Sequence, residues 1–253
     1  MTDDWDFYFA QVDDRPASLY VDLGAAGEAP LEHLPFMAYV RLHMRTPRED
    51  GLSSQDEFDR LIEIEDQLTA RLINEGCAYL GRYTGNGLRD FFFYVGDPSL
   101  WENRVAAVME GFPEYEYEAG TQEDPDWSTY FDFLFPPAED QQRISNRRLC
   151  AVLESNGDTL ETPREIDHWF YLPDAARGQA LIAEAATLQF AVRNCGWTED
   201  EDAYRVQLWR EDIPQPGSID ELTLAMLALA LSFDGDYDGW ETVLVTDEPT
   251  TLH

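Results

Sequence analysis

Apolar residues in the first half of the chain recur at two spacings, one typical of strands and one typical of helices. Alternating aromatic residues from Trp5 to Phe9 predict a strand. Ser54 and Glu57 have the spacing of a capping box and predict the start of a helix that ends at Gly76. The other elements predicted for this half are strands over residues 17–23, 36–44, 77–84, 88–95, 114–119 and 127–135 and a helix over residues 97–111.

The pattern breaks at residues 135–138 (FPPA), and a new series of helices and strands follows. Its elements are a helix over residues 139–155, strands over residues 166–172, 190–197, 204–210 and 240–245, and helices over residues 174–188 and 219–233.

Residues 36–119 and 166–245 therefore share one predicted order of elements, βαββαβ, which is the order of a ferredoxin-like fold. We expect an α+β protein of two tandem ferredoxin-like sandwiches, each an antiparallel sheet with helices packed on one face. The domain boundary is placed at the break, which divides the chain into residues 1–137 and 138–253.

The charge of the chain excludes several classes of function. It has 51 acidic and 17 basic side chains, a formal net charge of −34. Because binding to a phosphate backbone depends on Lys and Arg, direct binding to nucleic acid is not expected. The sequence contains no lysine, which also excludes Schiff-base and phosphate-loop chemistry.

Composition also bears on the compartment. No run of about 18 apolar residues is present, and the acidic first residues lack the profile of a signal peptide. Three widely spaced cysteines provide neither a disulfide framework nor a metal knuckle. We therefore expect a cytoplasmic protein that does not bind membranes.

Two segments of the second half resemble a known family. Residues 233–242 (FDGDYDGWET) resemble the C-terminal signature of the regulator of ribonuclease E activity B family, and residues 164–170 (REIDHWF) resemble its first strand. The resemblance covers about residues 139–248. Members are small acidic proteins that inhibit ribonuclease E by binding its C-terminal scaffold region. The resemblance thus implies a ferredoxin-like, protein-binding regulator without chemistry of its own.

The first half is similar to a bacterial family of unknown function that is often fused to this regulator-like domain. The similarity rests on residues 5–8 (WDFY), 15–18 (RPAS) and 50–53 (DGLS), and it covers roughly residues 1–136. It implies a fold and no activity.

The acidic segment before the last strand is the first candidate site. Asp234, Asp236 and Asp238 have the spacing of EF-hand ligands, but Val245 stands where the bidentate Glu of such a loop is required. We therefore expect no metal site, and either an acidic turn before a buried Trp240 or an acidic recognition surface. The candidate partner-binding residues of this segment are Asp234, Asp236, Tyr237, Asp238 and Trp240.

A second acidic candidate lies in the first half. Glu114, Glu116 and Glu118 alternate with other residues in a predicted strand, which places three carboxylates on one face. Such a row protects the edge of a sheet from aggregation, and the same geometry would bind an Arg-rich partner segment.

Residues with the potential for catalysis are isolated in the sequence. Strand alternation places Asp167 and Trp169 on one face and His168 on the other, so Asp167 is poorly placed to orient the imidazole. No serine has the setting of a nucleophile elbow, and no histidine pair has metal-ligand spacing. We assign no catalytic residue, metal or cofactor.

Two principal hypotheses remain at this point. The first is a non-catalytic, acidic regulatory protein that binds a protein with a basic or Arg-rich segment, such as ribonuclease E or a related RNA-degradation factor. The alternative is a small enzyme or ligand-binding protein with a site between the two domains, lined by Arg164, His168 and Trp169. A third possibility is an acidic scaffold that occupies a basic groove nonspecifically.

Overall fold

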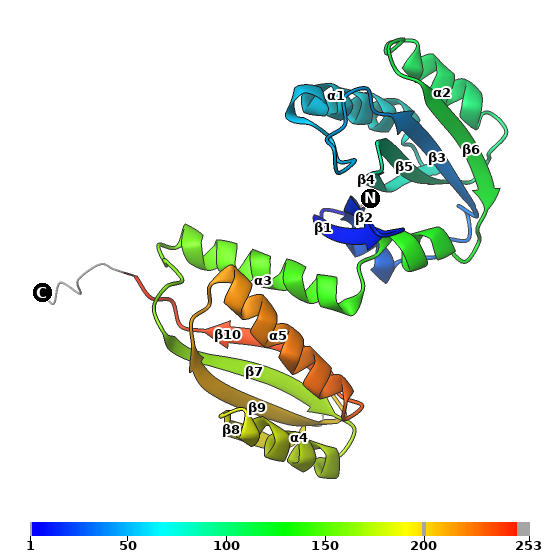
Figure 1. Cartoon of the computed structure of the whole chain (residues 1–253). Helices are drawn as coiled ribbons and strands as arrows, with labels where there is room; N and C mark the ends of the chain where they lie inside the picture. The colour runs from blue at the N-terminus through cyan, green and yellow to red at the C-terminus, as the bar shows by residue number, and fades with distance from the viewer. Residues whose placement is uncertain (1, 199–200, 247–253) are drawn as a thin grey trace, which may run out of the picture. The chain divides into compact units, whose positions relative to one another are not determined.

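The computed structural model of the chain describes residues 2–198 and 201–246. The chain divides into two units, Met1–Pro136 and Pro137–His253, which we call the N-terminal and C-terminal units and describe separately (Figure 1).

The N-terminal unit is built on a six-stranded antiparallel sheet with the order β1-β2-β4-β5-β3-β6. Its strands are β1 Trp5–Val12, β2 Arg15–Asp22, β3 Phe36–His43, β4 Cys77–Gly85, β5 Leu88–Val95 and β6 Tyr117–Glu123. Strands β3 to β6, with helices α1 (Gln55–Leu72) and α2 (Trp101–Met109), have the predicted ferredoxin-like order. The β1–β2 hairpin extends this sheet beyond β4.

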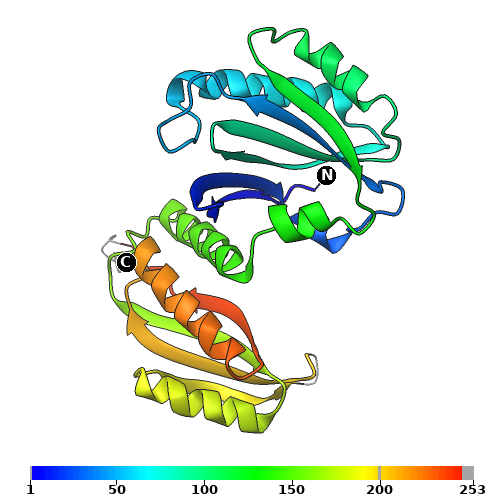
Figure 2. The same ribbon diagram turned by 45° about the vertical axis from the view of Figure 1, so that its right-hand side comes forward.

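Both faces of this sheet are covered, which explains the unbroken apolar run in β5. Phe91 and Phe93 pack under α1 and α2, together with Leu61 and Leu68 of α1. On the opposite face, the ring of Tyr94 stacks on Trp127 with 4.1 Å between the ring centroids. Figure 2 shows α1 and α2 on one side of the sheet and the helical segment near residue 130 on the other.

The strand predicted over residues 127–135 is wrong. Residues Thr129–Leu134 form a π-helix, η2, while residues Gly24–Gly27 form a short 3-10 helix, η1. The carboxylate of Asp124 accepts backbone hydrogen bonds from Ser128 (2.8 Å) and Thr129 (2.9 Å), and one from the Tyr94 hydroxyl (2.6 Å). These hydrogen bonds stabilise the start of the helical segment. The strand was predicted because the sequence of this segment is rich in aromatic residues, which are common in strands.

The predicted capping box of α1 is also absent. Ser54 occupies the N-cap position, but its side chain caps no backbone N–H. The carboxylate of Glu57 instead accepts hydrogen bonds from the backbone N–H groups of Arg45 and Thr46, each 2.8 Å long. Glu57 therefore joins the start of α1 to the end of β3.

The C-terminal unit contains a four-stranded antiparallel sheet with the order β10-β7-β9-β8, again the ferredoxin-like order. Its elements are α3 Ala138–Ser155, β7 Arg164–Leu172, α4 Ala175–Thr187, β8 Ala191–Thr198, β9 Ala203–Asp212, α5 Pro216–Leu231 and β10 Asp236–Thr242. The structure thus consists of two α+β units with antiparallel sheets, as predicted.

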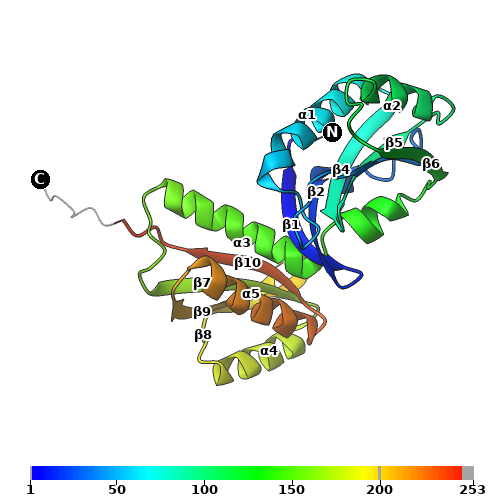
Figure 3. The same cartoon turned by 45° about the horizontal axis from the view of Figure 1, so that its top comes forward.

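Helices α4 and α5 lie on one face of this sheet. Leu181 of α4 and Met226 of α5 pack with Phe170, Val206 and Leu208 from the strands. Helix α3 lies beside α5 (Figure 3). No helix in the described part of the chain is long and apolar enough to cross a membrane.

Candidate functional site

One face of the C-terminal sheet carries none of this unit's helices. Strand β7 alternates strictly: His168 and Phe170 are fully buried toward the helices, while Asp167, Trp169 and Tyr171 are partly exposed on the opposite side. The alternation predicted for residues 167–169 is therefore confirmed.

Strand β9 presents the same two sides. Val206 and Leu208 are buried beneath the helices, and Gln207 and Trp209 lie on the other side. Trp169 pairs with Gln207, and Asp167 pairs with Trp209, so the two tryptophans are diagonal neighbours on adjacent strands.

Arginine side chains from β8 and β9 lie against both tryptophan rings. The Cζ atom of Arg205 is 5.3 Å from the ring centroid of Trp169, and that of Arg193 is 5.0 Å from Trp209. Arg193 also pairs with Asp167 (Nε–Oδ1, 2.5 Å) and with Glu165 (Nη2–Oε2, 2.6 Å). The hydrogen bond that Arg193 donates to the Asp167 carboxylate raises the pKa of Arg193.

Carboxylates surround this aromatic centre. The strand register places Glu211 opposite Glu165, Glu241 opposite Asp167 and Asp236 opposite Tyr171, and all three of these partners are exposed. We call the whole set the open face, and it consists of Glu165, Asp167, Trp169, Tyr171, Arg193, Arg205, Gln207, Trp209, Glu211, Asp236 and Glu241. Its five carboxylates and two guanidinium groups give a net charge of −3.

Of this set, the sequence pattern indicates Trp169 and Asp236 as candidate site residues, but not Trp209, Arg193, Arg205 or Gln207. A signal for β9 was present: residues 204–210 (YRVQLWR) alternate apolar and polar positions, with a tryptophan on the polar side. A large aromatic residue on the solvated side of a strand is typical of an interaction surface.

The acidic segment before β10 is divided between the surface and the core. Asp234 and Asp238 are exposed, and Asp234 pairs with Arg177 (Oδ2–Nη2, 3.2 Å). Tyr237 and Trp240 point inward, where the Trp240 indole N–H donates to Asn146 Oδ1 at 2.8 Å. Residues 236–238 belong to the strand itself, and residues 2–198 and 201–246 contain no group of three or more potential metal ligands.

The predicted row of three carboxylates near residue 116 does not form, because β6 begins at Tyr117. Glu114 lies in the preceding turn, where its Oε1 accepts a 2.8 Å hydrogen bond from Arg60 Nε. Glu116 is exposed in the connection, and Glu118 is the one member on the strand, 3.2 Å from His43. Strand β6 is at the edge of the sheet.

Arg164, His168 and Trp169 do not line one site. Arg164 forms a buried ion pair with Asp158 (Nη2–Oδ1, 2.7 Å), and His168 Nδ1 is hydrogen-bonded to the Tyr237 hydroxyl at 2.8 Å. Burial, with a smaller contribution from the charge of Arg210, lowers the pKa of His168 to about 3. Both residues are on the helix side of the sheet, opposite to Trp169.

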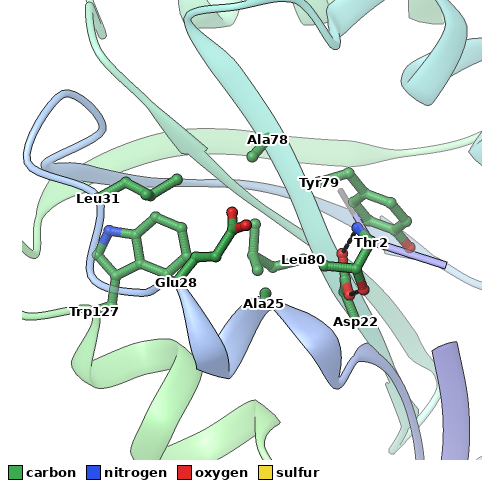
Figure 4. Close-up of a pocket in the computed structure, with 9 residues that line it drawn as sticks. All are labelled: Thr2, Asp22, Ala25, Glu28, Leu31, Ala78, Tyr79, Leu80 and Trp127. Atoms are coloured by element: carbon green, nitrogen blue, oxygen red, sulfur yellow. Dashed lines mark hydrogen bonds between the residues drawn. The ribbon is translucent and has the colours of Figure 1, made fainter. Parts of the chain in front are cut away.

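The cavity in Figure 4, in the N-terminal unit, is small. Its volume is about 30 Å³, and it is lined by Thr2, Asp22, Ala25, Glu28, Leu31, Ala78, Tyr79, Leu80 and Trp127. At one end the buried Asp22 carboxylate accepts hydrogen bonds from the backbone N–H and the hydroxyl of Thr2. Such a volume accommodates an ordered water rather than an organic substrate.

The chain consists of two ferredoxin-like α+β units, and the second has a sheet face that carries two partly exposed tryptophans and five carboxylates. Residues 3–135 match the model of a family of unknown function (DUF695), and the chain belongs to this family. Residues 143–242 match the family described as regulator of ribonuclease activity B. Both resemblances noted in the sequence are thereby confirmed, and the second implies a role in regulating ribonuclease activity.

Other comparisons carry less information. No curated protein matches the chain. An unknown protein from Galdieria sulphuraria is 11% identical, with 82% of this chain and 97% of that chain covered, at a TM-score of 0.22. A putative glycine cleavage system transcriptional repressor is 7% identical, with 82% and 98% covered, also at 0.22. Neither likeness bears on the function.

Proposed function

We propose that this protein is a non-catalytic cytoplasmic regulator that binds an Arg-rich segment of ribonuclease E, or of a related RNA-degradation protein, through the open face. The observation that carries the proposal is the pair Trp169 and Trp209, presented side by side within a ring of carboxylates. Tryptophan, tyrosine and arginine are the residues most enriched at the energetic centres of protein interfaces.

The chemistry of the open face matches a basic segment. Guanidinium groups stack on indole rings, as Arg193 and Arg205 already do, and form bidentate contacts with carboxylates. Exposed Asp236 and Glu241 on β10 are available for such contacts. The net charge of −34 would speed the encounter with a basic partner, and it disfavours RNA as the occupant.

The test is calorimetric titration of the full chain with purified host ribonuclease E, and separately with a synthetic Arg-rich peptide from its C-terminal region. Truncation of a central interface aromatic residue costs about 2 kcal/mol or more, so we expect Trp209→Ala to weaken binding by about thirtyfold or more. Binding should also weaken with added salt, because opposite charges are screened.

The matched control is Trp197→Ala. Trp197 is also a half-exposed tryptophan of the same sheet, but it pairs with Tyr204 and therefore belongs to the helix side. Equal effects of the two substitutions, or unchanged affinity in Trp209→Ala, would contradict the assignment of the open face. Tight binding of a single-stranded RNA of mixed sequence in the same assay would contradict the proposal of a protein partner and would indicate that the partner is RNA.

A further inference from the structure

The edge of the C-terminal sheet at β8 differs from the other sheet edges in its charge. In the described part of the chain the two sheets end at β1, β6, β8 and β10, and of these strands β8 alone contains no carboxylate. Proteins commonly place charged side chains on edge strands, because the backbone N–H and C=O groups of an edge otherwise pair with a second chain. Its one charged residue, Arg193, is held on the open face by Asp167 and Glu165.

The low charge of this edge extends to the neighbouring helix. Residues 175–198, which include α4 and β8, contain one acidic residue, Glu184, and two arginines, a net charge of +1. Acidic residues adjoin this segment in the sequence on both sides, at Asp174 and at 199–202 (EDED). Helix α4 lies beside β8 (Figure 1). A second copy of this chain, whose net charge is −34, would therefore meet little like-charge repulsion at this edge.

Large apolar side chains are exposed along the same edge. Val192 and Trp197 of β8 are 43% and 53% exposed, and Leu188, which follows α4, is 43% exposed. The strand register places Val192 opposite Leu208 and Trp197 opposite Tyr204, so both side chains are on the helix side of the sheet. A group of exposed apolar side chains is typical of a surface that another protein molecule covers.

The register of β8 also makes the strand complementary to itself. A β-bulge between Val192 and Asn194 leaves Arg193 as an extra residue. In an antiparallel pair, opposed residues point to the same face of the sheet. When two copies of β8 pair along their whole length, Cys195 lies opposite Cys195 of the second copy, and Val192 lies opposite Trp197. All four of these side chains are on the helix side, as such pairing requires.

We propose that two copies of this protein associate by antiparallel pairing of their β8 strands about a two-fold axis at Cys195, which joins the two four-stranded sheets into one. Backbone hydrogen bonds and the contacts between Val192 and Trp197 on both sides of the axis stabilise the pair. Antiparallel pairing also directs the C-terminal ends of the two strands, where acidic residues follow in the sequence, away from each other.

A second copy suits this edge better than an Arg-rich segment does, because β8 has no carboxylate to accept hydrogen bonds from guanidinium groups. The two-fold axis places the open faces of both copies on the same side of the joined sheet and leaves them accessible. The dimer does not depend on the proposed regulatory function.

The first experiment measures the mass of the full chain by light scattering over a range of concentrations. We expect a dimer, with twice the chain mass of 29.0 kDa, that dissociates on dilution. Val192→Asp should weaken it about tenfold or more, because it adds a carboxylate to the interface of two acidic chains. The matched control Val243→Asp, at an exposed valine after β10, should not. Added salt should strengthen the dimer by screening like charges, whereas it weakens binding of a basic partner.

The second experiment locates the axis. Opposed Cβ atoms in an antiparallel pair are about 4.5–5.5 Å apart, close to the spacing of a disulfide. Diamide, which takes one hydrogen from each of two thiols, should therefore link the dimer through the exposed Cys195. Cys195→Ser should remain dimeric without a link, because Cys77 and Cys150 are buried. The control Cys195→Ser/Ser232→Cys, with its thiol at an exposed position after α5, should link much more slowly.

Three results would overturn the proposal: a monomer at every concentration, a dimer that Val192→Asp does not weaken, or equal linking through the relocated thiol. Loss of binding of the Arg-rich peptide in Val192→Asp would also overturn it, because the edge would then pair with a partner segment instead of a second copy. Circular dichroism shows whether each variant is folded, and the Cys195 link in the wild type keeps the test valid if Val192→Asp is not.

Discussion

The buried imidazole of His168 makes the stability of the C-terminal unit sensitive to mild acid. Its ring is fully buried, with Nδ1 hydrogen-bonded to Tyr237 and Nε2 without a partner in the described part of the chain. The pKa falls from 6.5 to about 3 on folding because burial disfavours the charged form. Below pH 6.5 the unfolded state therefore binds a proton that the folded state does not.

This difference in proton binding determines how much the free energy of unfolding changes with pH. Stability contributed by His168 is fully present above its unfolded pKa and is lost progressively as the pH falls from 6.5 toward about 3. Between about pH 7.5 and about pH 5 the linkage relation gives a loss of about 2 kcal/mol. The full shift corresponds to about 5 kcal/mol. Carboxylates contribute little to this window because their ordinary pKa values lie near 4.

The assay is urea unfolding of the full chain and of His168→Leu at a series of pH values. At neutral pH the variant should be less stable by about 1–3 kcal/mol, because it leaves the Tyr237 hydroxyl without its partner. The difference in free energy of unfolding between the wild type and His168→Leu should decrease by about 2 kcal/mol on going to about pH 5, because only the wild type has the titrating imidazole.

The matched control is His33→Leu, which removes an exposed imidazole in the segment before β3. Its pH dependence should remain parallel to that of the wild type. A constant gap between wild type and His168→Leu across this range would refute the reasoning, because it would mean that His168 takes up a proton equally in both states.

Two further substitutions test local features of the C-terminal unit. A hydrogen bond from Arg164 lowers the pKa of the buried Asp158 carboxyl group. Arg164→Met leaves this carboxylate without its ion-pair partner and should reduce the free energy of unfolding by about 3–5 kcal/mol in urea titration. A loss below about 1 kcal/mol would contradict this role. Gly239→Ala should cost about 1–3 kcal/mol in thermal unfolding because Gly239 has a φ of 111°, although nothing would touch the added Cβ. Gly217→Ala, in α5 and equally open, should be neutral or stabilising, and equal losses in the two would count against backbone strain.

Local signals in the sequence were sufficient for most of the elements. The turn at Asn86 and Gly87 has positive φ at both positions, 52° and 75°, as a tight hairpin requires. Asp174 caps α4 by accepting a hydrogen bond from the backbone N–H of Arg177. Such features depend on residues within a few positions of each other, which is why they are visible in the sequence.

Predictions failed where a distant residue supplied the partner. The Tyr94 hydroxyl, which comes from β5, accepts a hydrogen bond from the backbone N–H of Tyr130 and donates one to Asp124, and these contacts stabilise the helical segment over residues 129–134. Glu57 was expected to cap its own helix, but the N–H groups of Arg45 and Thr46 at the end of β3 bind it instead. Periodicity contains no information about these contacts.

The sequence by itself determined the element order, the two ferredoxin-like units and the strongly acidic character of the protein, because these follow from composition and short-range periodicity. Only the tertiary structure decided which face of each strand the helices cover. The strand order β10-β7-β9-β8 brings Trp169 and Trp209 together, although forty residues separate them, and it buries His168 and Trp240 on the other side. Sites assembled across neighbouring strands depend on register, and register is set by the packing of the whole sheet.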